Sequence, residues 1–229
     1  MSFVIAGFQK TTLLDYPEKI ACIVFTQGCN FKCGYCHNPE LFEKKEPVMT
    51  LPAFFEFLKS RTGKLDGVVI TGGEPTLQKD LKDFIKEIKS LGFLVKLDTN
   101  GTNPDIIEEL LMENLIDYIA MDIKAPLDKY SNITNTNVNK DNIQRSINII
   151  LGSKIDYEFR TTSVKEQLDI EDFKQIGTLI SGAKRYYIQK FVPDKIFDKS
   201  FKNKTSLDET DFRTVKNLLK QDIQVIELR

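Results

Sequence analysis

The hydrophobic and polar positions of this chain repeat one unit, in which a short apolar run is followed by a turn and a longer amphipathic stretch. Residues 78–91 show the spacing of one helical face, because apolar side chains recur there at Leu81, Phe84, Ile85, Ile88 and Leu91. The runs VVI and YIAMDI are almost continuously apolar, which is typical of strands covered on both faces. The pattern predicts strands at residues 20–26, 67–71, 94–98, 118–123, 157–161 and 186–191. It predicts helices at residues 51–61, 78–91, 104–112, 140–151 and 169–180.

Six strand–helix alternations predict an α/β fold with parallel strands joined by right-handed crossovers. The sheet would be an open doubly wound sheet or a curved partial barrel, since six units fall short of the eight in a closed barrel. Outside a core at 20–191, we expect an edge hairpin within 3–19, a helix at 207–220 and a strand at 225–228. Residues 132–142 are polar and asparagine-rich and predict a loop. No linker is evident, so residues 1–229 are expected to form a single domain.

Charge and hydropathy argue against two classes of partner. The 229 residues carry 32 Lys and Arg against 33 Asp and Glu, a net charge of −1, and no basic stripe indicates nucleic-acid binding. No apolar run is long enough to cross a bilayer, and the apolar start lacks the basic region and cleavage site of a signal peptide. We therefore expect a cytosolic protein whose thiols stay reduced.

Three of the four cysteines lie close together in the string GCNFKCGYCHNPE, as Cys29, Cys33 and Cys36. A [4Fe–4S] cluster usually takes four thiolates, and the remaining cysteine, Cys22, lies in the strand-like run IACIVF. A cluster held by the three loop cysteines would keep one iron open to a small chelating molecule. The spacing therefore favours a cluster with an open corner that can pass an electron to a bound molecule.

Two other readings of the cysteines stay open at this point. Zinc requires four nitrogen or sulfur ligands, and the only histidine, His37, is adjacent to Cys36, so a zinc site would need Cys22 or a carboxylate. A disulfide with one spare thiol is also open, although nothing in the sequence indicates an oxidising compartment.

Polar residues follow several predicted strands at the point where each strand ends. In the string TGGEP, Gly72 and Gly73 have no Cβ, so the backbone can approach a ligand, and Glu74 could accept a hydrogen bond from an ammonium group. A tight turn before a helix is the alternative reading of this string. The later strands end in or carry Asp98, Asp122, Lys124, Arg160 and Gln189. Any one of them could be an ordinary exposed or capping residue, but ends of parallel strands converge at one edge, and there we expect the site.

With these motifs together, the chain resembles the radical S-adenosylmethionine (SAM) superfamily. The cysteine loop has an aromatic residue, Tyr35, before its last cysteine, and GGEP follows at the end of the next strand. The resemblance covers residues 20–191 and implies a partial (β/α)6 barrel with a curved parallel sheet and helices outside. It implies that SAM chelates the open iron of a [4Fe–4S] cluster held by Cys29, Cys33 and Cys36. The reduced cluster would then cleave SAM to methionine and a 5′-deoxyadenosyl radical, which abstracts hydrogen from the substrate.

The same resemblance implies roles for the residues at the strand ends. Gly72, Gly73 and Glu74 match the segment that receives the SAM amino group, and Asp98 matches a position near the SAM ribose and carboxylate. Tyr35 is expected to line the adenine side.

Charged residues further along the chain are also given roles by the resemblance. In glycyl-radical activases, carboxylates at the positions of Asp98 and Asp122 can hold a monovalent cation beside SAM. Lys124 and Arg160 are expected to pair with carboxylate groups.

A longer segment, residues 7–41, resembles the activating proteins of anaerobic ribonucleoside-triphosphate reductase. It carries Asp15-Tyr16-Pro17 ahead of the strand and then the GCN and YCHNP strings, with Glu18 where glycine is common. This implies a glycine loop of the reductase as substrate, flavodoxin or ferredoxin as reductant, and a single cluster, since no cysteine-rich insert follows. Two alternatives remain, a small-molecule radical SAM enzyme similar to deazaguanine synthases and a non-enzymatic zinc or redox protein.

Overall fold

The computed structural model describes residues 3–43 and 46–229 of this α/β protein. Its chain forms two compact units. The N-terminal unit comprises residues 1–30, 40–99 and 105–119, and the C-terminal unit comprises residues 31–39, 100–104 and 120–229. Among the described residues, no helix combines the length and apolar character needed to span a membrane.

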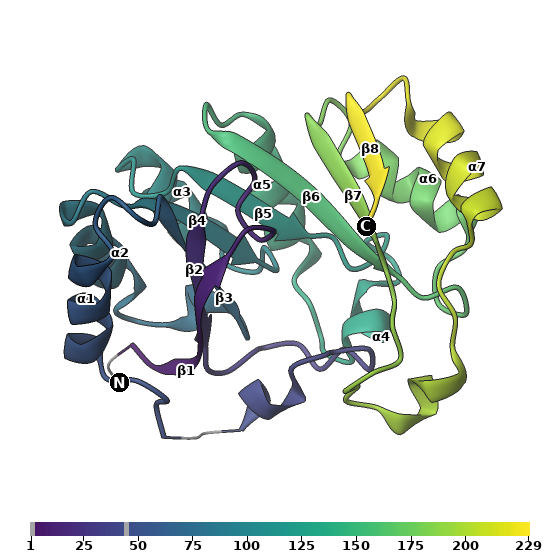
Figure 1. Cartoon of the computed structure of the whole chain (residues 1–229). Coiled ribbons are helices and arrows are strands. Elements are labelled where there is room, and N and C mark those ends of the chain that lie inside the picture. Colours follow the sequence, from purple (N-terminus) through teal and green to yellow (C-terminus); the bar gives the residue numbers. More distant parts are fainter. Residues whose placement is uncertain (1–2, 44–45) are drawn as a thin grey trace. The chain divides into compact units, whose positions relative to one another are not determined.

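In the N-terminal unit, four strands follow one another in chain order (Figure 1). The first two strands are antiparallel, and the second, third and fourth are parallel. The strands are β1 (Ile5–Thr12), β2 (Ala21–Thr26), β3 (Gly67–Gly72) and β4 (Leu94–Thr99). The helices are α1 (Leu51–Ser60), α2 (Leu81–Ser90) and α3 (Pro104–Met112), with short 3-10 helices at Pro39–Phe42 and Pro75–Leu77. In the range 3–19, where an edge hairpin was expected, the described residues form one strand, β1, which pairs antiparallel with β2.

Aromatic packing holds the first two helices of this unit together. Helix α1 begins after Thr50, whose hydroxyl accepts the Ala53 N–H. It buries Phe54 and Phe55, whose ring centroids lie 5.3 and 5.6 Å from that of Phe84 on α2. Such contacts add to the free energy gained by burying apolar surface.

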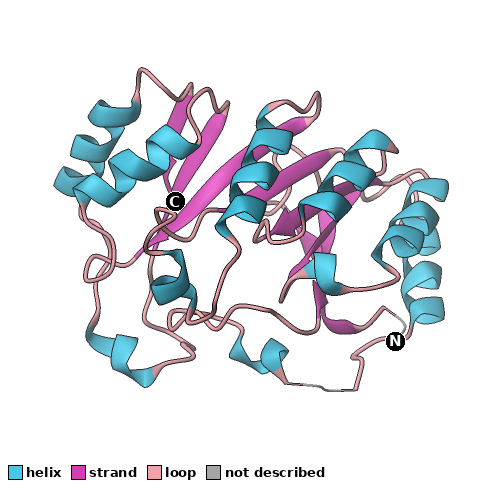
Figure 2. Ribbon diagram, turned by 180° about the vertical axis from the view of Figure 1, so that it is seen from behind, coloured by secondary structure: helices cyan, strands magenta, loops and turns pink. Residues whose placement is uncertain are grey.

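The C-terminal unit contains three neighbouring strands that pair in parallel. They are β6 (Asp156–Ser163), β7 (Arg185–Lys190) and β8 (Val225–Leu228). The helices are α4 (Tyr130–Thr134), α5 (Lys140–Leu151), α6 (Ile170–Leu179) and α7 (Glu209–Leu219), with a 3-10 helix at Lys199–Asn203. In Figure 2 the longer helices of each unit lie in front of its strands.

Strand β5 (Tyr118–Asp122) belongs partly to each unit. At its start, the Asp117 N–H donates to the Val95 carbonyl, 2.8 Å away, within the N-terminal unit. Just after its end, the Ile123 N–H donates to the Arg160 carbonyl, also at 2.8 Å, within the C-terminal unit. The strand order therefore follows the chain from β1 to β8, as expected for successive strand–helix units.

The predicted elements are confirmed except at some boundaries and in one loop. The helix predicted at residues 78–91 is shorter in the structure. A 3-10 helix at Pro75–Leu77 precedes it, and α2 begins only at Leu81. The loop predicted at 132–142 is wrong at both ends. Helix α4 runs to Thr134, because Tyr130 and Ile133 are buried, and Asn135 ends it in the left-handed conformation. Helix α5 already begins at Lys140, capped by the Asn139 side chain. The single domain stays a prediction.

Candidate active site

The end of β3 is pressed against the residues that precede the first loop cysteine. Gly72 has a φ of 114°, and a Cβ on Gly73 would lie 1.9 Å from the Gly28 carbonyl oxygen and 3.3 Å from the Cys29 nitrogen. The Gly73 N–H donates to the Thr26 carbonyl at 3.0 Å, and the Glu74 N–H donates to the Gly28 carbonyl at 2.8 Å. The two glycines are thus required for this close backbone approach, which fixes where the cysteine loop begins.

Glu74 is a buried carboxylate, only 1% exposed, at the start of the 3-10 helix. Its Oε1 accepts hydrogen bonds from the Thr76 N–H at 3.1 Å, the Thr76 hydroxyl, and the Thr99 hydroxyl at 2.8 Å. The tight-turn reading of GGEP is therefore correct for the backbone, and it does not exclude a binding role. These three donors orient the carboxylate.

Lys96 is a site residue that the sequence reasoning missed. It is 1% exposed within β4, and its ammonium pairs with Asp98, two residues further along the same strand face. Its Nζ also lies 5.7 Å from the centroid of the Tyr118 ring. A lysine inside the otherwise apolar run LVKL was the available signal, because lysine is rarely buried without a partner.

In the C-terminal unit, Asp122 lies between two cations. Arg160 Nε is 2.8 Å from Asp122 Oδ1, and Lys124 Nζ is 3.0 Å from Oδ2. Burial alone would raise the pKa of Asp122, but the charges of Arg160 and Lys124 outweigh it and hold that pKa well below its usual range. Burial likewise tends to lower the pKa of Lys124, yet Asp122 raises it well above its ordinary value. All three groups are therefore charged at neutral pH.

The second half of the cysteine loop lies beside this ion-paired group. Burial raises the pKa of the Cys33 thiol, while the Lys124 charge and the Tyr35 hydroxyl act in the opposite direction. Lys124 Nζ is 5.9 Å from the centroid of the Tyr35 ring. The Tyr35 hydroxyl is buried and makes no hydrogen bond of ordinary geometry to the described residues. The C-terminal unit thus brings together Cys33, Tyr35, Cys36, Asp122, Lys124 and Arg160.

Two other residues singled out from the sequence are Cys22 and Gln189. Cys22 is fully buried in β2, where burial raises its pKa to about 12, as expected of an inert structural cysteine. Gln189 lies in β7, and its backbone carbonyl accepts a hydrogen bond from the Ser163 hydroxyl at 3.1 Å. Within the described ranges, no group of three or more His, Cys, Asp or Glu side chains is found that could hold a metal ion. The assignment of Cys29, Cys33 and Cys36 as cluster ligands rests on their motif and on the family reported below.

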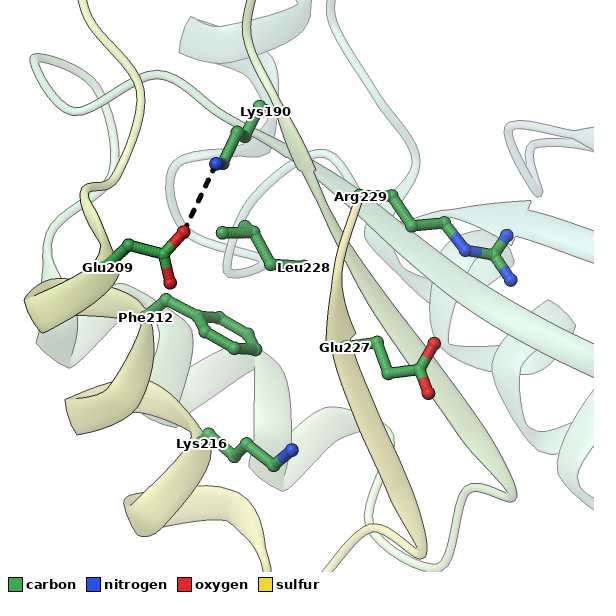
Figure 3. Close-up of a pocket in the computed structure, with 7 residues that line it drawn as sticks. All are labelled: Lys190, Glu209, Phe212, Lys216, Glu227, Leu228 and Arg229. Atoms are coloured by element: carbon green, nitrogen blue, oxygen red, sulfur yellow. Dashed lines mark hydrogen bonds and ion pairs between the residues drawn. The ribbon is translucent and has the colours of Figure 1, made fainter.

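A cavity of about 360 Å³ lies elsewhere in the C-terminal unit, between α7 and the end of β8. Lys190, Glu209, Phe212 and Arg229 are among its lining residues, and Lys190 pairs with Glu209 across it at 3.4 Å (Figure 3). Its lining contains no cysteine, so we do not assign it to the reaction.

The scaffold is a parallel α/β sheet with a cysteine loop after its first parallel strand. Buried charged side chains lie at the ends of later strands. Enzymes of this class bind a cofactor at those strand ends. The chain belongs to the radical SAM superfamily, whose profile matches residues 23–177. The expected fold class and enzymatic nature are thereby confirmed, and the family implies a [4Fe–4S] cluster and SAM.

Individual proteins are also similar to this chain in sequence or in fold. A protein of Methanocaldococcus jannaschii, provisionally named a glycyl-radical enzyme activating enzyme, is 35% identical over 100% of this chain and 97% of its own length. A pyruvate formate-lyase-activating enzyme of Clostridium pasteurianum is 33% identical over 129 residues, which is 52% of each chain. Among solved structures, Streptococcus suis SuiB bound to S-adenosylmethionine gives a TM-score of 0.70 at 14% identity, covering 90% of this chain and 49% of that one. At that identity the likeness concerns the fold alone.

The described residues fit a thiolate-held cluster in two respects. The unsatisfied Tyr35 hydroxyl is a buried polar atom of the cysteine loop that lacks a partner of ordinary geometry. The Lys124 ammonium offsets part of the rise that burial causes in the pKa of Cys33, and this contribution favours the thiolate that binds iron. Within this unit, Cys33 and Cys36 would be among the ligands.

Proposed function

We propose that this enzyme generates a glycyl radical on an anaerobic ribonucleoside-triphosphate reductase. The observation that carries the proposal is the 35% identity, along the whole chain, to the protein provisionally named a glycyl-radical enzyme activating enzyme. The choice of the reductase as partner rests on Asp15-Tyr16-Pro17 and the GCN and YCHNP strings. When bound, the cluster and SAM supply the radical chemistry, and this chain's residues bind and orient them.

The roles proposed for individual side chains follow from their surroundings. Cys29, Cys33 and Cys36 hold the cluster. Glu74, with Gly72 and Gly73 before it, accepts the SAM ammonium, and the hydroxyls of Thr76 and Thr99 orient its carboxylate.

The remaining polar side chains are proposed to complete the SAM site. Asp98 is oriented by Lys96 toward the ribose, and Tyr35 lines the adenine side. Lys124 and Arg160, held by Asp122, face carboxylate groups of the bound molecule.

A monovalent cation at Asp98 and Asp122 stays a prediction. Asp98 already pairs with Lys96, and Asp122 already pairs with Lys124 and Arg160. Comparing the SAM affinity in buffers with and without K+ or Na+ tests whether these side-chain cations suffice. The cytosolic location also stays a prediction.

The decisive experiment combines the anaerobically reconstituted and reduced protein with SAM and the reductase. Flavodoxin or ferredoxin serves as the reductant, and a glycyl signal in electron paramagnetic resonance is the expected result. Cys33→Ser is the control and should give neither a complete cluster nor SAM cleavage, because an oxygen ligand binds cluster iron less well than a thiolate. Pyruvate formate-lyase offered in place of the reductase tests the partner. A radical on that protein alone would overturn the assignment of the reductase.

A further inference from the structure

A segment after β7 lies along the cysteine loop within the C-terminal unit. We name residues 191–203 the strap and residues 33–37 the ligand turn. The Phe197 N–H of the strap donates to the Cys36 carbonyl at 3.1 Å, and the Asp198 N–H donates to the Gly34 carbonyl at 3.0 Å. His37 Nε2 hydrogen-bonds to the Val192 carbonyl at 2.9 Å. Three main-chain groups of the strap therefore hold the turn that carries Cys33 and Cys36.

The aromatic ring of Phe201, in the strap, packs against the ligand turn. A Cβ added to Gly34 would lie 2.3 Å from Cε2 of Phe201, so the ring occupies the space of a side chain at position 34. The Phe201 ring is 4% exposed, and its centroid lies 6.4 Å from that of Tyr35. Glycine at position 34 is thus explained by the strap, because its φ is not in the left-handed region.

Further hydrogen bonds lie within the strap and tie its first residue, Phe191, to Ser206, three residues beyond its last. The Asp198 side chain accepts the Ser200 N–H at 2.8 Å and so caps the 3-10 helix that carries Phe201. The Phe191 N–H donates to the Ser206 hydroxyl at 3.2 Å, and Ser206 bonds to Ser163 of β6 at 2.6 Å. A segment closed in this way is a rigid support for the turn.

We propose that the strap is a positioning element for the cluster, which holds the ligand turn in its binding conformation before iron and sulfide are inserted. Without the strap, the turn would have to lose its conformational freedom at the moment of cluster binding. Phe201 acts through Gly34 and Tyr35 and is therefore a positioning residue. The inference rests on the cysteines as cluster ligands and not on the identity of the activated partner.

The test uses the metal-free full-length protein. The rate at which iodoacetamide labels Cys33 and Cys36 is followed by mass spectrometry, and iron and sulfide per chain are measured after anaerobic reconstitution. In Phe201→Ala we expect labelling to be about tenfold faster, because the turn opens locally. We expect cluster insertion to be slower and less complete.

A double-mutant cycle sharpens the test. Gly34→Ala alone should act like Phe201→Ala, because its methyl group displaces the ring. In the double variant that methyl group enters the vacated space, so the two effects should be far from additive. Phe212→Ala, on α7, is the matched control and should label and reconstitute like the unchanged protein.

Several outcomes decide the proposal. Unchanged labelling in both single variants, or additive effects in the double variant, would overturn it. Should Phe201→Ala fail to fold, Phe201→Leu replaces it, because this variant keeps part of the apolar volume and should show an intermediate labelling rate. Because these readouts need neither SAM nor a partner, failure of the proposed function would leave them intact.

Discussion

Glu74 of the N-terminal unit and Asp122 of the C-terminal unit are both carboxylates at the ends of parallel strands, but different partners hold them. Glu74 accepts hydrogen bonds from neutral groups of Thr76 and Thr99. Asp122 lies between the charges of Arg160 and Lys124. The hydroxyls of Thr76 and Thr99 orient the Glu74 carboxylate, whereas the ion pairs of Asp122 hold the side chains of Arg160 and Lys124 in place. The comparison teaches that hydrogen bonds set the direction of Glu74, whereas Asp122 acts through its partners.

The largest effect is expected from breaking the ion-paired group. Arg160→Leu leaves Asp122 with one cation and should lower the free energy of unfolding by about 2 kcal/mol, less than for a wholly buried pair because Asp122 is 27% exposed. Urea unfolding measures the loss. Arg185→Leu is the control, since its pair with Asp156 is exposed and should contribute less than about 0.5 kcal/mol. Equal losses in the two variants would contradict the special role of Arg160.

The dependence of the free energy of unfolding on pH should also differ between the unchanged protein and Arg160→Leu, by less than the loss predicted above. The folded-state pKa of Asp122 is lowered, so its contribution is complete above the unfolded value of about 4 and is lost as the pH falls toward the folded value. In Arg160→Leu this pKa should move back toward its ordinary value, so stability should fall less steeply below about pH 4. Other carboxylates with lowered pKa values, such as Glu166, contribute to both curves. The difference between the two curves therefore reports on the carboxylates that Arg160 pairs with, Asp122 and Glu158. Superimposable normalised curves would speak against the prediction.

The smallest effect is expected at the hydroxyl-bonded carboxylate. Thr99→Val removes one donor to Glu74 without changing the shape of the side chain and should lower stability by about 1 kcal/mol. It should also weaken SAM binding several-fold by calorimetry, because Glu74 loses part of its orientation. Thr214→Val, on the exposed face of α7, provides the matched control. A loss of stability with unchanged SAM affinity would make Thr99 purely structural.

Local pattern predicted most elements because helix and strand periodicity are short-range properties of the chain. The boundaries of Pro104–Met112 and Lys140–Leu151 agree with the prediction, and so does the tail strand Val225–Leu228. The predicted loop at 132–142 failed because polar composition was weighed above Tyr130 and Ile133, whose burial against the rest of the unit supports a short helix.

The candidate site was predictable only where the chemistry is encoded in a local motif. Cys29, Cys33 and Cys36, with the glycines before Glu74, stand out as motifs in the sequence, and their roles stay predictions. Lys96 was missed because a lone lysine in a strand usually reaches solvent, and the apolar residues around it in the run LVKL were not weighed against that expectation.

By itself, then, the sequence determined the α/β alternation, the cysteine motif and the family, because each depends on residues that are neighbours along the chain. Only the tertiary structure decided that Thr99 holds Glu74, that Arg160 holds Asp122, and that Phe201 fills the place of a side chain at Gly34. Such pairs are far apart in sequence, as with His37 and Val192, which lie 155 residues apart. They meet because the crossovers return successive strands to one sheet, and no local pattern records which side chains then touch.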